Sequence, residues 1–212
     1  MEISWFGHSC FQIVDSVGRS IITDPPAERV GYDLPNVLAD VVLISHDHYD
    51  HNNFEAIKGN PAVIRGPGEH TASGITFYGV RTLHDDKGGR LRGENTVYIF
   101  ALDRMRVCHL GDLGHILSSD QIREIGSVDI LMIPVGGVFT LDARGASEVV
   151  DQIRPRVIIP MHFKTDALRM NVETALRFLK GRMPEGPLKR LTIMPEDLSS
   201  ESPRTILFDY RR

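Results

Sequence analysis

A histidine-rich segment near position 50 holds the densest group of metal-ligand side chains in the sequence. It starts at His46, reads HDHYDH, and follows the apolar run Val41–Ser45, which has the pattern of a strand buried on both faces. Side chains two residues apart on an extended chain point the same way, so His46 and His48 can reach one point. Asp50 and His51 come where the chain turns, and they can aim at a second point close by. These residue types bind Zn²⁺ or a related divalent ion, and two directions of approach suggest two ions.

Three more side chains of ligand type follow apolar runs later in the chain. His84, Asp112 and His162 each come at, or just beyond, the end of such a run. Because open sheets place their sites at the carboxyl ends of strands, we expect these three to join the histidine-rich segment at one edge. A single histidine after a strand is most often satisfied elsewhere, but four strand ends that all carry ligand types indicate a metal site.

The elements that must hold these side chains are mostly short strands. The runs with strand composition are Ile3–Phe6, Cys10–Val14, Arg19–Thr23, Val41–Ser45, Ala62–Ile64, Ile75–Val80, Thr96–Ala101, Arg106–Leu110, Ile130–Pro134, Val157–Pro160, Leu191–Ile193 and Thr205–Phe208. Helical spacing is found at Ala146–Ile153 and Val172–Leu179, and Ser119–Ile125 is a shorter candidate behind a serine cap. This order predicts an α/β protein, α+β by some schemes, with two sheets packed face to face and helices outside.

Length and composition describe an ordinary folded protein. The chain has 212 residues, 42% of them hydrophobic and 25% charged, so we expect one domain over residues 1–212. With 24 Lys and Arg against 28 Asp and Glu, the net charge of -4 gives no overall attraction to nucleic acid or an anionic membrane. The longest uncharged apolar run, Ile130–Leu141, is too short to cross a bilayer. Two distant cysteines and the lack of a secretory signal favour the cytoplasm.

The order of the ligand candidates resembles the metallo-β-lactamase superfamily, whose signature is H-x-H-x-D-H, then a distant His, a Gly-Asp pair and a final His. The matching residues span nearly the whole chain and are His46, His48, Asp50, His51, His84, Gly111-Asp112 and His162. Four segments are similar to the branch related to L-ascorbate-6-phosphate lactonase: Gly7-His8-Ser9, Thr23-Asp24-Pro25, Pro134–Gly137 and Ile159–His162. The resemblance implies a four-layer αββα sandwich with a two-metal site in the cleft between its sheets.

The same resemblance implies how the ligands divide between two ions. One ion would be held by His46, His48 and His84. The other would be held by Asp50, His51 and His162, with Asp112 as the bridge. Asp112 stands where the family's hydrolytic β-lactamases typically use cysteine, which disfavours a β-lactam substrate, and His48 stands where flavodiiron relatives carry glutamate, which disfavours a redox di-iron site. Zn²⁺ is the favoured metal, while Mn²⁺ and Fe²⁺ suit the same donors.

Four residues close to these positions are candidates for supporting roles. Asp24 could accept the free N–H of a ligating histidine, or it is an ordinary turn residue. His8, at the end of the first strand, is expected to contact substrate or the ligands, with a buried structural role as the alternative. His115 and Lys164 lie on loops that leave ligand positions, so they could meet an anionic group on the substrate or simply be solvated.

The polar, glycine-rich segment His84–Asn95 has the composition of a loop over a cleft. Arg90 and Arg92 could bind phosphate from it, and a charged surface hairpin is an equally good interpretation. His109 has no assigned role, because strand alternation can turn it away from the site.

These residues predict a hydrolase with a binuclear metal site. Two ions roughly 3.5 to 4 Å apart can share a water, so a metal-bound hydroxide would be the nucleophile. Asp50 is the candidate catalytic residue, because it can orient that hydroxide and pass a proton to the leaving group, unless it is only a ligand. The family branch favours a small, anionic, ester-like substrate, either a lactone or a phosphorylated sugar derivative. Two alternatives stay open: a metal-dependent phosphodiesterase or nuclease, and a metal-binding or sensing protein without turnover. The oligomeric state is open as well.

Overall fold

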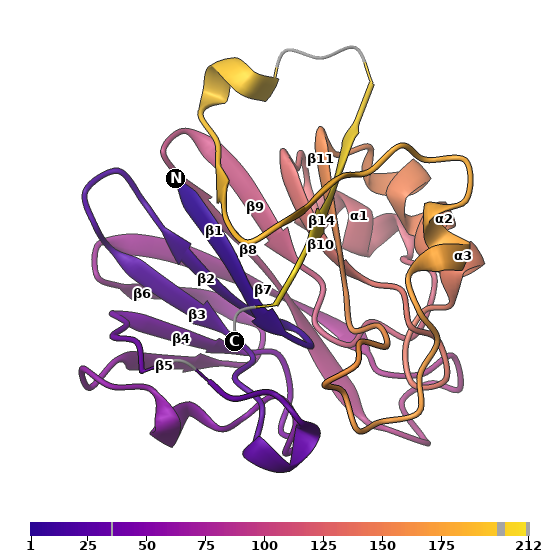
Figure 1. Ribbon diagram of the computed structural model, residues 1–212, viewed down its shortest axis with the longest axis horizontal. Helices are drawn as coiled ribbons and strands as arrows, with labels where there is room; N and C mark the ends of the chain where they lie inside the picture. The colour runs from indigo at the N-terminus through magenta and orange to yellow at the C-terminus, as the bar shows by residue number, and fades with distance from the viewer. Residues whose placement is uncertain (35, 199–201, 211–212) are drawn as a thin grey trace.

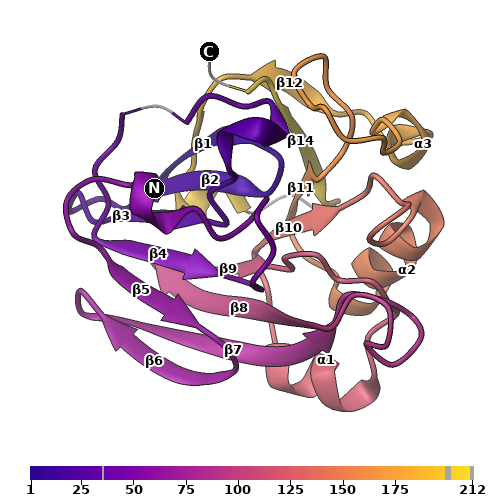
Figure 2. The same ribbon diagram turned by 90° about the horizontal axis from the view of Figure 1, so that it is seen from below.

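Two β-sheets packed face to face form the centre of the computed structural model, which describes residues 1–34, 36–198 and 202–210 (Figures 1 and 2). Within these residues the first sheet has six strands in the order β13-β1-β2-β3-β4-β5. Their bounds are β1 Glu2–Gly7, β2 Cys10–Val14, β3 Ser20–Thr23, β4 Val41–Ile44, β5 Ala62–Arg65 and β13 Leu191–Thr192. The first three strands pair in antiparallel fashion, whereas β3, β4 and β5 are parallel. The carboxyl ends of β3 and β4 therefore lie at the same edge.

The second sheet, counted over the same residues, has eight strands in the order β12-β14-β11-β10-β9-β8-β7-β6. Their bounds are β6 Gly68–Ala72, β7 Ile75–Leu83, β8 Glu94–Leu102, β9 Met105–His109, β10 Ile130–Pro134, β11 Val157–Met161, β12 Glu185–Leu188 and β14 Arg204–Phe208. Strands β6 to β9 are antiparallel, and β9, β10, β11, β14 and β12 are parallel. The carboxyl ends of β9, β10 and β11 consequently share one edge.

Helices cover the second sheet on the side away from the first (Figures 1 and 2). They are α1 Ser119–Ile125, α2 Ala143–Ile153 and α3 Leu176–Leu179. The first begins with a capping box, because the Ser118 hydroxyl accepts from the Gln121 backbone N–H and the Gln121 side chain accepts from the Ser118 N–H. The short 3₁₀ helices in the described part of the chain are η1 Glu28–Val30, η2 Phe54–Ala56 and η3 Pro195–Leu198. No helix among the described residues combines the length and apolar character that crossing a bilayer requires.

Alternate residues of the first sheet belong to two different apolar clusters. Trp5 and Leu43 lie in a large cluster that includes buried residues of the second sheet and its helices. Their neighbours Phe6 and Ile44 point to the opposite face and pack in a smaller cluster with Ile57, beside the η2 segment. Because both faces of these strands are covered, their sequences are apolar throughout rather than alternating.

The two-sheet prediction is confirmed, and every predicted strand run overlaps a strand. Strands β6 and β12 were not predicted, because both contain glycine and the latter also contains proline. The predicted helix Val172–Leu179 is wrong in its first half, since only Leu176–Leu179 is helical. The Glu173 N–H donates to Gly136 O at 2.7 Å, so tertiary hydrogen bonds replace the helical ones there. Leu176, expected to be on the apolar face, is 74% exposed.

Candidate metal centre

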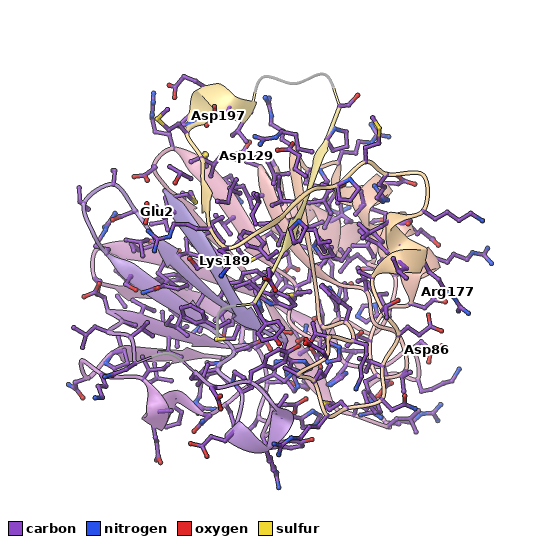
Figure 3. The ribbon with its side chains drawn as sticks, in the orientation of Figure 1. Glu2, Asp86, Asp129, Arg177, Lys189 and Asp197 are labelled. Carbon is purple, nitrogen blue, oxygen red and sulfur yellow. The ribbon has the colours of Figure 1, made fainter. Side chains whose placement is uncertain are left out.

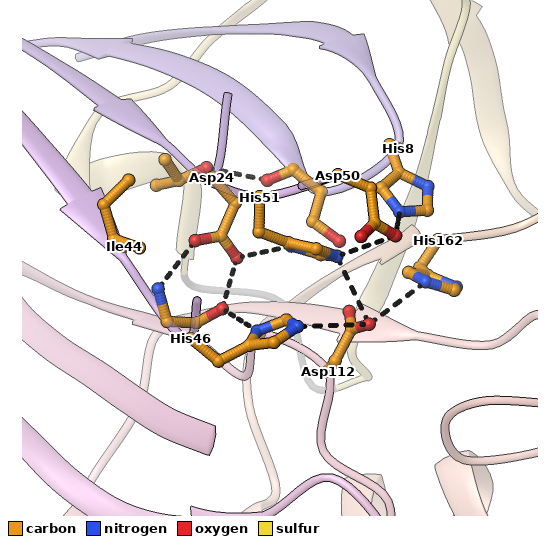
Figure 4. Close-up of polar contacts among 12 residues, drawn as sticks. His8, Asp24, Ile44, His46, Asp50, His51, Asp112 and His162 are labelled. Atoms are coloured by element: carbon orange, nitrogen blue, oxygen red, sulfur yellow. Dashed lines mark hydrogen bonds and ion pairs between the residues drawn. The ribbon is translucent and has the colours of Figure 1, made fainter. Parts of the chain in front are cut away.

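Strand ends from both sheets bring the polar side chains of the site together (Figure 4). The side chains and the strands they follow are His8 (β1), Asp24 (β3), His46 (β4), His84 (β7), Asp112 (β9) and His162 (β11). Asp50 and His51 belong to the turn that begins at His46. In the first sheet β1 and β3 both pair antiparallel with β2, so they run in the same direction as β4. In the second sheet β7, β9 and β11 likewise run in one direction. The strand ends that carry these side chains therefore share an edge of each sheet, and residues 154 positions apart (8 to 162) converge.

Three of these residues have a backbone conformation that is rare for side-chain-bearing residues. His8, Asp24 and His162 have φ values of 54°, 38° and 51°. This left-handed region costs on the order of 1–3 kcal/mol for each residue, so the surrounding structure must stabilise it. The sharp turn takes the chain off the strand and directs each side chain toward the others (Figure 4).

Gly111 allows the Asp112 loop to lie against its neighbours. Its φ is +54°, and a Cβ there would lie 2.4 Å from Asn95 Oδ1 and 2.5 Å from Ser45 Cβ. In the space left by glycine, the Asp112 N–H donates to Asn95 Oδ1 at 2.9 Å. Asn95 in turn donates to the Leu110 carbonyl at 2.9 Å, which fixes both ends of this short loop.

His46, His48 and His84 form the first group of possible metal ligands. One ring nitrogen from each lies within 4.8 Å of the others. The ring centroids of His46 lie 4.5 Å from His48 and 4.7 Å from His84. His46 and His84 are buried, whereas His48 is half-buried and faces a cavity. Three imidazoles that converge in this way can hold one divalent ion.

A second group consists of His8, Asp50, His51 and His162, whose ligand atoms also lie within 4.8 Å of one another. All four are buried. His8 Nε2 is 3.2 Å from Asp50 Oδ2, and the rings of His8 and His162 are 4.1 Å apart. Three members are the residues the resemblance implies for the second ion. His8 is an addition, because the sequence analysis predicts only a supporting role for it.

Asp112 lies between the two groups. Its Oδ2 atom is 3.2 Å from the Nε2 atoms of His84, His51 and His162. The same oxygen is 4.0 Å from His46 Nε2 (Figure 4). One carboxylate therefore approaches histidines of both groups, which is the position a bridging ligand would occupy.

The ligand atoms of this cluster lack ordinary hydrogen-bond partners. Of nine buried side-chain N or O atoms without a partner among the described residues, seven belong to the cluster. They are His8 Nδ1, His46 Nε2, His51 Nε2, His84 Nδ1, Asp112 Oδ1 and both ring nitrogens of His162. Leaving such an atom unpaired costs about 1–3 kcal/mol of folding free energy. A cluster with seven unpaired atoms therefore needs a bound partner that compensates for this cost. Imidazole nitrogen with carboxylate oxygen is a donor set that fits Zn²⁺, Mn²⁺ or Fe²⁺.

Burial and neighbouring charges set the protonation of the cluster. Burial lowers the pKa of His46 to about 3 and that of His8 to about 4, so both imidazoles are neutral, as ligands must be. Burial alone would raise the pKa of Asp112, but the His162 and His51 charges lower it well below its usual value. Burial opposes the charge on His51 too, yet the nearby Asp112 raises the pKa of that imidazole well above normal. The metal-free cluster thus contains a cationic His51 among carboxylates.

Asp24 holds two of the histidines in a defined orientation. His51 Nδ1 donates to Asp24 Oδ2 at 3.1 Å, which leaves His51 Nε2 free to face Asp112. The Ser45 hydroxyl donates to the same carboxylate at 2.6 Å and lies 2.9 Å from His46 Nδ1. Because that hydroxyl already donates to Asp24, His46 Nδ1 must carry the proton and its Nε2 is free. Such carboxylate contacts fix the tautomer and ring direction of metal-binding histidines.

The remaining polar candidates are engaged away from the cluster. His115 Nε2 accepts from the Leu83 N–H at 3.1 Å, and its Nδ1 donates to Ile116 O at 2.8 Å. The Lys164 ammonium donates to the carbonyls of Leu168 and Met170, the latter at 3.0 Å, so it stabilises its own loop.

His109 is buried at the end of β9 and belongs to none of the possible ligand groups found among the described residues. Its Nε2 donates to Ser9 O at 3.0 Å, while its Nδ1 accepts from the Gly111 N–H at 3.2 Å. Both ring nitrogens are therefore used in hydrogen bonds with backbone, which is a structural role.

A cavity of about 290 Å³ opens beside the cluster. Its walls contain His48, Tyr49, Asp50, His84, Arg92, Asp112, Phe139, His162 and Met170. A hollow of about 530 Å³ adjoins it, sharing His48 and Arg92. The ligand groups are thus accessible to a small molecule.

The chain belongs to the beta-lactamase superfamily, because the family model for the beta-lactamase superfamily domain matches residues 2–162. Within that superfamily it falls in the UPF0173 group. A UPF0173 protein of Pyrococcus abyssi is 33% identical, over 78% of this chain and 84% of the relative. A UPF0173 metal-dependent hydrolase of Pyrobaculum islandicum is 29% identical, over 78% of this chain and 85% of the relative.

A solved structure shows the same fold over the whole chain. The Thermotoga maritima protein, described as a candidate Zn-dependent hydrolase of the metallo-beta-lactamase superfamily, is 37% identical with a TM-score of 0.80. The match covers 99% of each chain. The superfamily that the sequence resembles is therefore confirmed, and these relatives place the chain among its metal-dependent hydrolases.

Sequence reasoning named seven of the eight ligand candidates that the structure brings together, and it gave the eighth, His8, a supporting role. It did not find Ser45 and Asn95, which orient His46 and Asp112, because isolated Ser and Asn residues carry no recognisable signal. It also ranked His8 below the ligands, although His8 stands after a strand end as the others do. The position of His8 after a strand end, which it shares with the other ligand candidates, was the signal in the sequence that could have identified it.

Proposed function

We propose that this protein is a hydrolase that uses two divalent metal ions to cleave a small ester-like substrate, either a lactone or a phosphorylated sugar derivative. The observation that carries the proposal is the position of Asp112 Oδ2, 3.2 Å from His84 of one ligand group and 3.2 Å from His51 and His162 of the other. A carboxylate shared in this way fits a pair of neighbouring ions. The substrate class follows the similarity of the sequence to the lactonase branch.

The first ion would be held by His46, His48 and His84. The second would be held by Asp50, His51 and His162, with His8 as a further donor and Asp112 shared. When bound, a pair of divalent ions supplies an acidified water and polarises the bond to be cleaved. Zn²⁺ is our choice of metal, and Mn²⁺ and Fe²⁺ fit the same nitrogen and carboxylate donors.

Asp50 is the residue we propose to move protons. Its carboxylate lines the cavity and is held by His8 Nε2 at 3.2 Å. Burial raises the pKa of this carboxyl, but the contacts with His51 and His8 outweigh it and keep the pKa far below its usual value. Asp50 is therefore ionised and can accept hydrogen bonds, and we propose that it orients the attacking water and passes the proton of that water to the leaving group.

An open site favours turnover over storage or sensing. A structural metal site is closed by protein ligands, whereas a catalytic site keeps a position for water or substrate. Here His48 is half-buried, and four residues of the ligand groups, His48, Asp50, His84 and His162, line the cavity. The cavity is at the small end of the range for ligand sites, which supports a small substrate over a nucleic acid. We propose that the substrate is a small metabolite and that the protein acts in the cytoplasm.

The test compares two substrates on the Zn²⁺- or Mn²⁺-loaded protein. A sugar lactone and a chromogenic phosphodiester are assayed side by side, with Asp112→Ala as the inactive variant and exposed Asp86→Ala as its matched control. We expect hydrolysis of the lactone, at least about 100-fold slower in Asp112→Ala and unchanged in Asp86→Ala. Hydrolysis of the phosphodiester alone would replace this proposal with the phosphodiesterase or nuclease alternative. Bound metal without turnover of either would favour the metal-binding alternative.

A further inference from the structure

Arg92 places a positive charge in the wall of the cavity that holds the metal ligands. It lines that cavity together with His48, Asp112 and His162, and it also lines the two neighbouring hollows of about 530 and 410 Å³. Its guanidinium carbon lies 4.1 Å from the centre of the Phe139 ring. A guanidinium stacked on an aromatic ring keeps its N–H groups free at the edge of its plane.

The charge of Arg92 has no acidic partner among the described residues, because nearby acids are engaged elsewhere. Glu94 pairs with Arg81. Asp86 is 67% exposed at the edge of the molecule, where it lies 3.4 Å from the Lys87 ammonium (Figure 3). The nearby Arg90 differs from Arg92 in its contacts, since its Nε donates to the Lys87 carbonyl of its own loop at 2.8 Å and it is not among the residues that line the cavity.

Asp85 fixes Arg92 relative to the metal ligands. It directly follows His84, and its carboxylate accepts four backbone N–H groups of the loop. The donors are Lys87 at 2.8 Å, Gly89 at 2.9 Å, Leu91 at 2.9 Å and Arg92 at 2.8 Å. One carboxylate therefore ties the backbone of Arg92 to the residue beside a ligand. Such a preformed loop lowers the entropy cost of binding a ligand group.

The Phe139 side of this contact is also held in place. Phe139 follows Val138, whose φ of 61° is a genuine outlier for a β-branched residue. Val138 is 65% exposed, so packing of its own side chain does not explain the strain. The turn is held by the Gly137 N–H, which donates to Leu141 O at 3.1 Å. Strain of this kind persists where the surrounding structure imposes it, frequently at binding sites.

We propose that Arg92 is the specificity-determining residue of this site and that it binds a single carboxylate or phosphate group on the substrate. The anionic group pairs with the guanidinium on Phe139, while the bond to be cleaved lies beside Asp112. Tyr49, Phe139 and Met170 contact the carbon skeleton. The substrate is thus a small ester or lactone with one anionic group at its far end. This inference rests on the proposed hydrolase function.

The test compares Arg92→Met with Arg90→Met, which removes a neighbouring charge of the same loop. Kinetics are measured on the metal-loaded protein with a neutral sugar lactone, the same lactone bearing a phosphate, and one bearing a carboxylate. We expect Arg92→Met to raise KM for the preferred anionic lactone about 10- to 100-fold, with kcat and the neutral lactone changed less than about twofold. Arg92→Lys should recover part of the loss, and Arg90→Met should match the wild type.

Binding of simple anions gives a readout that does not depend on turnover. Inorganic phosphate and acetate are titrated by calorimetry into the metal-loaded wild type, Arg92→Met and Arg90→Met. The bound metal ions contribute equally to anion binding in all three proteins. A difference in anion affinity between the variants therefore measures the contribution of Arg92. Weaker binding of phosphate, acetate or both in Arg92→Met alone supports the inference and identifies the group.

Two results would overturn the assignment of Arg92. One is anion binding in Arg92→Met equal to that of the wild type. The other is an equal loss for neutral and anionic lactones, which would indicate a structural role. If no lactone is hydrolysed by any variant but anion binding still falls in Arg92→Met, the proposed function fails and the anion subsite stands.

Discussion

His51 Nδ1 donates to Asp24 Oδ2 at 3.1 Å, while the opposite nitrogen of the same ring lies 3.2 Å from Asp112 Oδ2. One imidazole thus connects a buried carboxylate behind the site to the carboxylate at its centre. The first contact holds the proton on Nδ1 and directs the second nitrogen toward Asp112, so we expect Asp24 to influence metal binding without being a ligand.

Replacing Asp24 by Asn should weaken metal binding about 10- to 100-fold, because the orientation of His51 and, through Ser45, of His46 is lost. Zinc affinity measured by competition with a chelator checks this. Asp40→Asn is the matched control, since Asp40 also accepts a backbone N–H, from Ser20 at 2.8 Å, but at the other end of β3. Equal zinc affinities in the two variants would contradict the role given to Asp24.

Variants of His84 and His109 test which histidines are metal ligands and which have a structural role. His84→Ala should lose metal from the first group, because it removes one of three convergent imidazoles. His109→Ala should keep the metal content of the wild type but lower the free energy of unfolding by roughly 1–3 kcal/mol, because the buried Gly111 N–H loses its acceptor and the Ser9 carbonyl loses one of its two donors. Metal analysis and urea unfolding measure the two effects. Full metal retention in His84→Ala, with loss in His109→Ala, would show the assignment to be wrong.

The metal-free protein should lose stability as the pH falls from 6.5 toward 4. Burial lowers the pKa of His8 to about 4 and that of His46 to about 3, from an ordinary value of 6.5. Below pH 6.5 the unfolded chain binds protons at both residues and the folded chain does not, so the free energy of unfolding decreases. The raised pKa of His51 contributes stability that is lost only above about pH 6.5, so it does not mask the trend.

Urea unfolding at pH 6.5 and pH 5 measures this loss. His8→Gln should show a smaller difference between the two pH values than the wild type, because one of the histidines whose pKa is lowered by folding is gone. A metal-free protein that is equally stable at both pH values would exclude this explanation.

Val138→Asn should raise the free energy of unfolding by about 0.5–1 kcal/mol, because asparagine tolerates the left-handed conformation that valine resists. For a chain of this length the melting temperature should rise by roughly 1–4 °C. Val17→Asn is the control, since Val17 is 75% exposed and has no positive φ. Thermal unfolding distinguishes the two, and a gain in Val17→Asn equal to that in Val138→Asn would rule out backbone strain as the cause.

Much of the site could be predicted because ligand residues at strand ends are a local signal. His46 and Asp50 belong to one short segment, and His162 follows an apolar run whose strand character is clear from composition. The parallel pairing of β9, β10 and β11 then brings the strand ends to one edge. The hydrophobic periodicity of the strands, with the rule that open sheets place their sites at the carboxyl ends of strands, was sufficient to predict that these residues converge.

Features that depend on tertiary contacts could not be predicted. The helix expected from Val172 begins only at Leu176, because backbone groups of the preceding residues bond to other loops. The contact of Arg92 with Phe139 joins two loops 47 positions apart (92 to 139), and neither loop has a pattern that reveals the other. Arg90 and Arg92 look equivalent in the sequence, yet only Arg92 lies over Phe139 and lines the cavity, whereas Arg90 bonds to the Lys87 carbonyl.

Anomalous X-ray diffraction at the zinc edge, on crystals of the Zn²⁺-loaded protein, tests the central claim most directly. We expect two peaks on either side of Asp112, one among His46, His48 and His84 and the other among His8, Asp50, His51 and His162. A single peak, or two peaks that do not share Asp112, would contradict the two-metal centre.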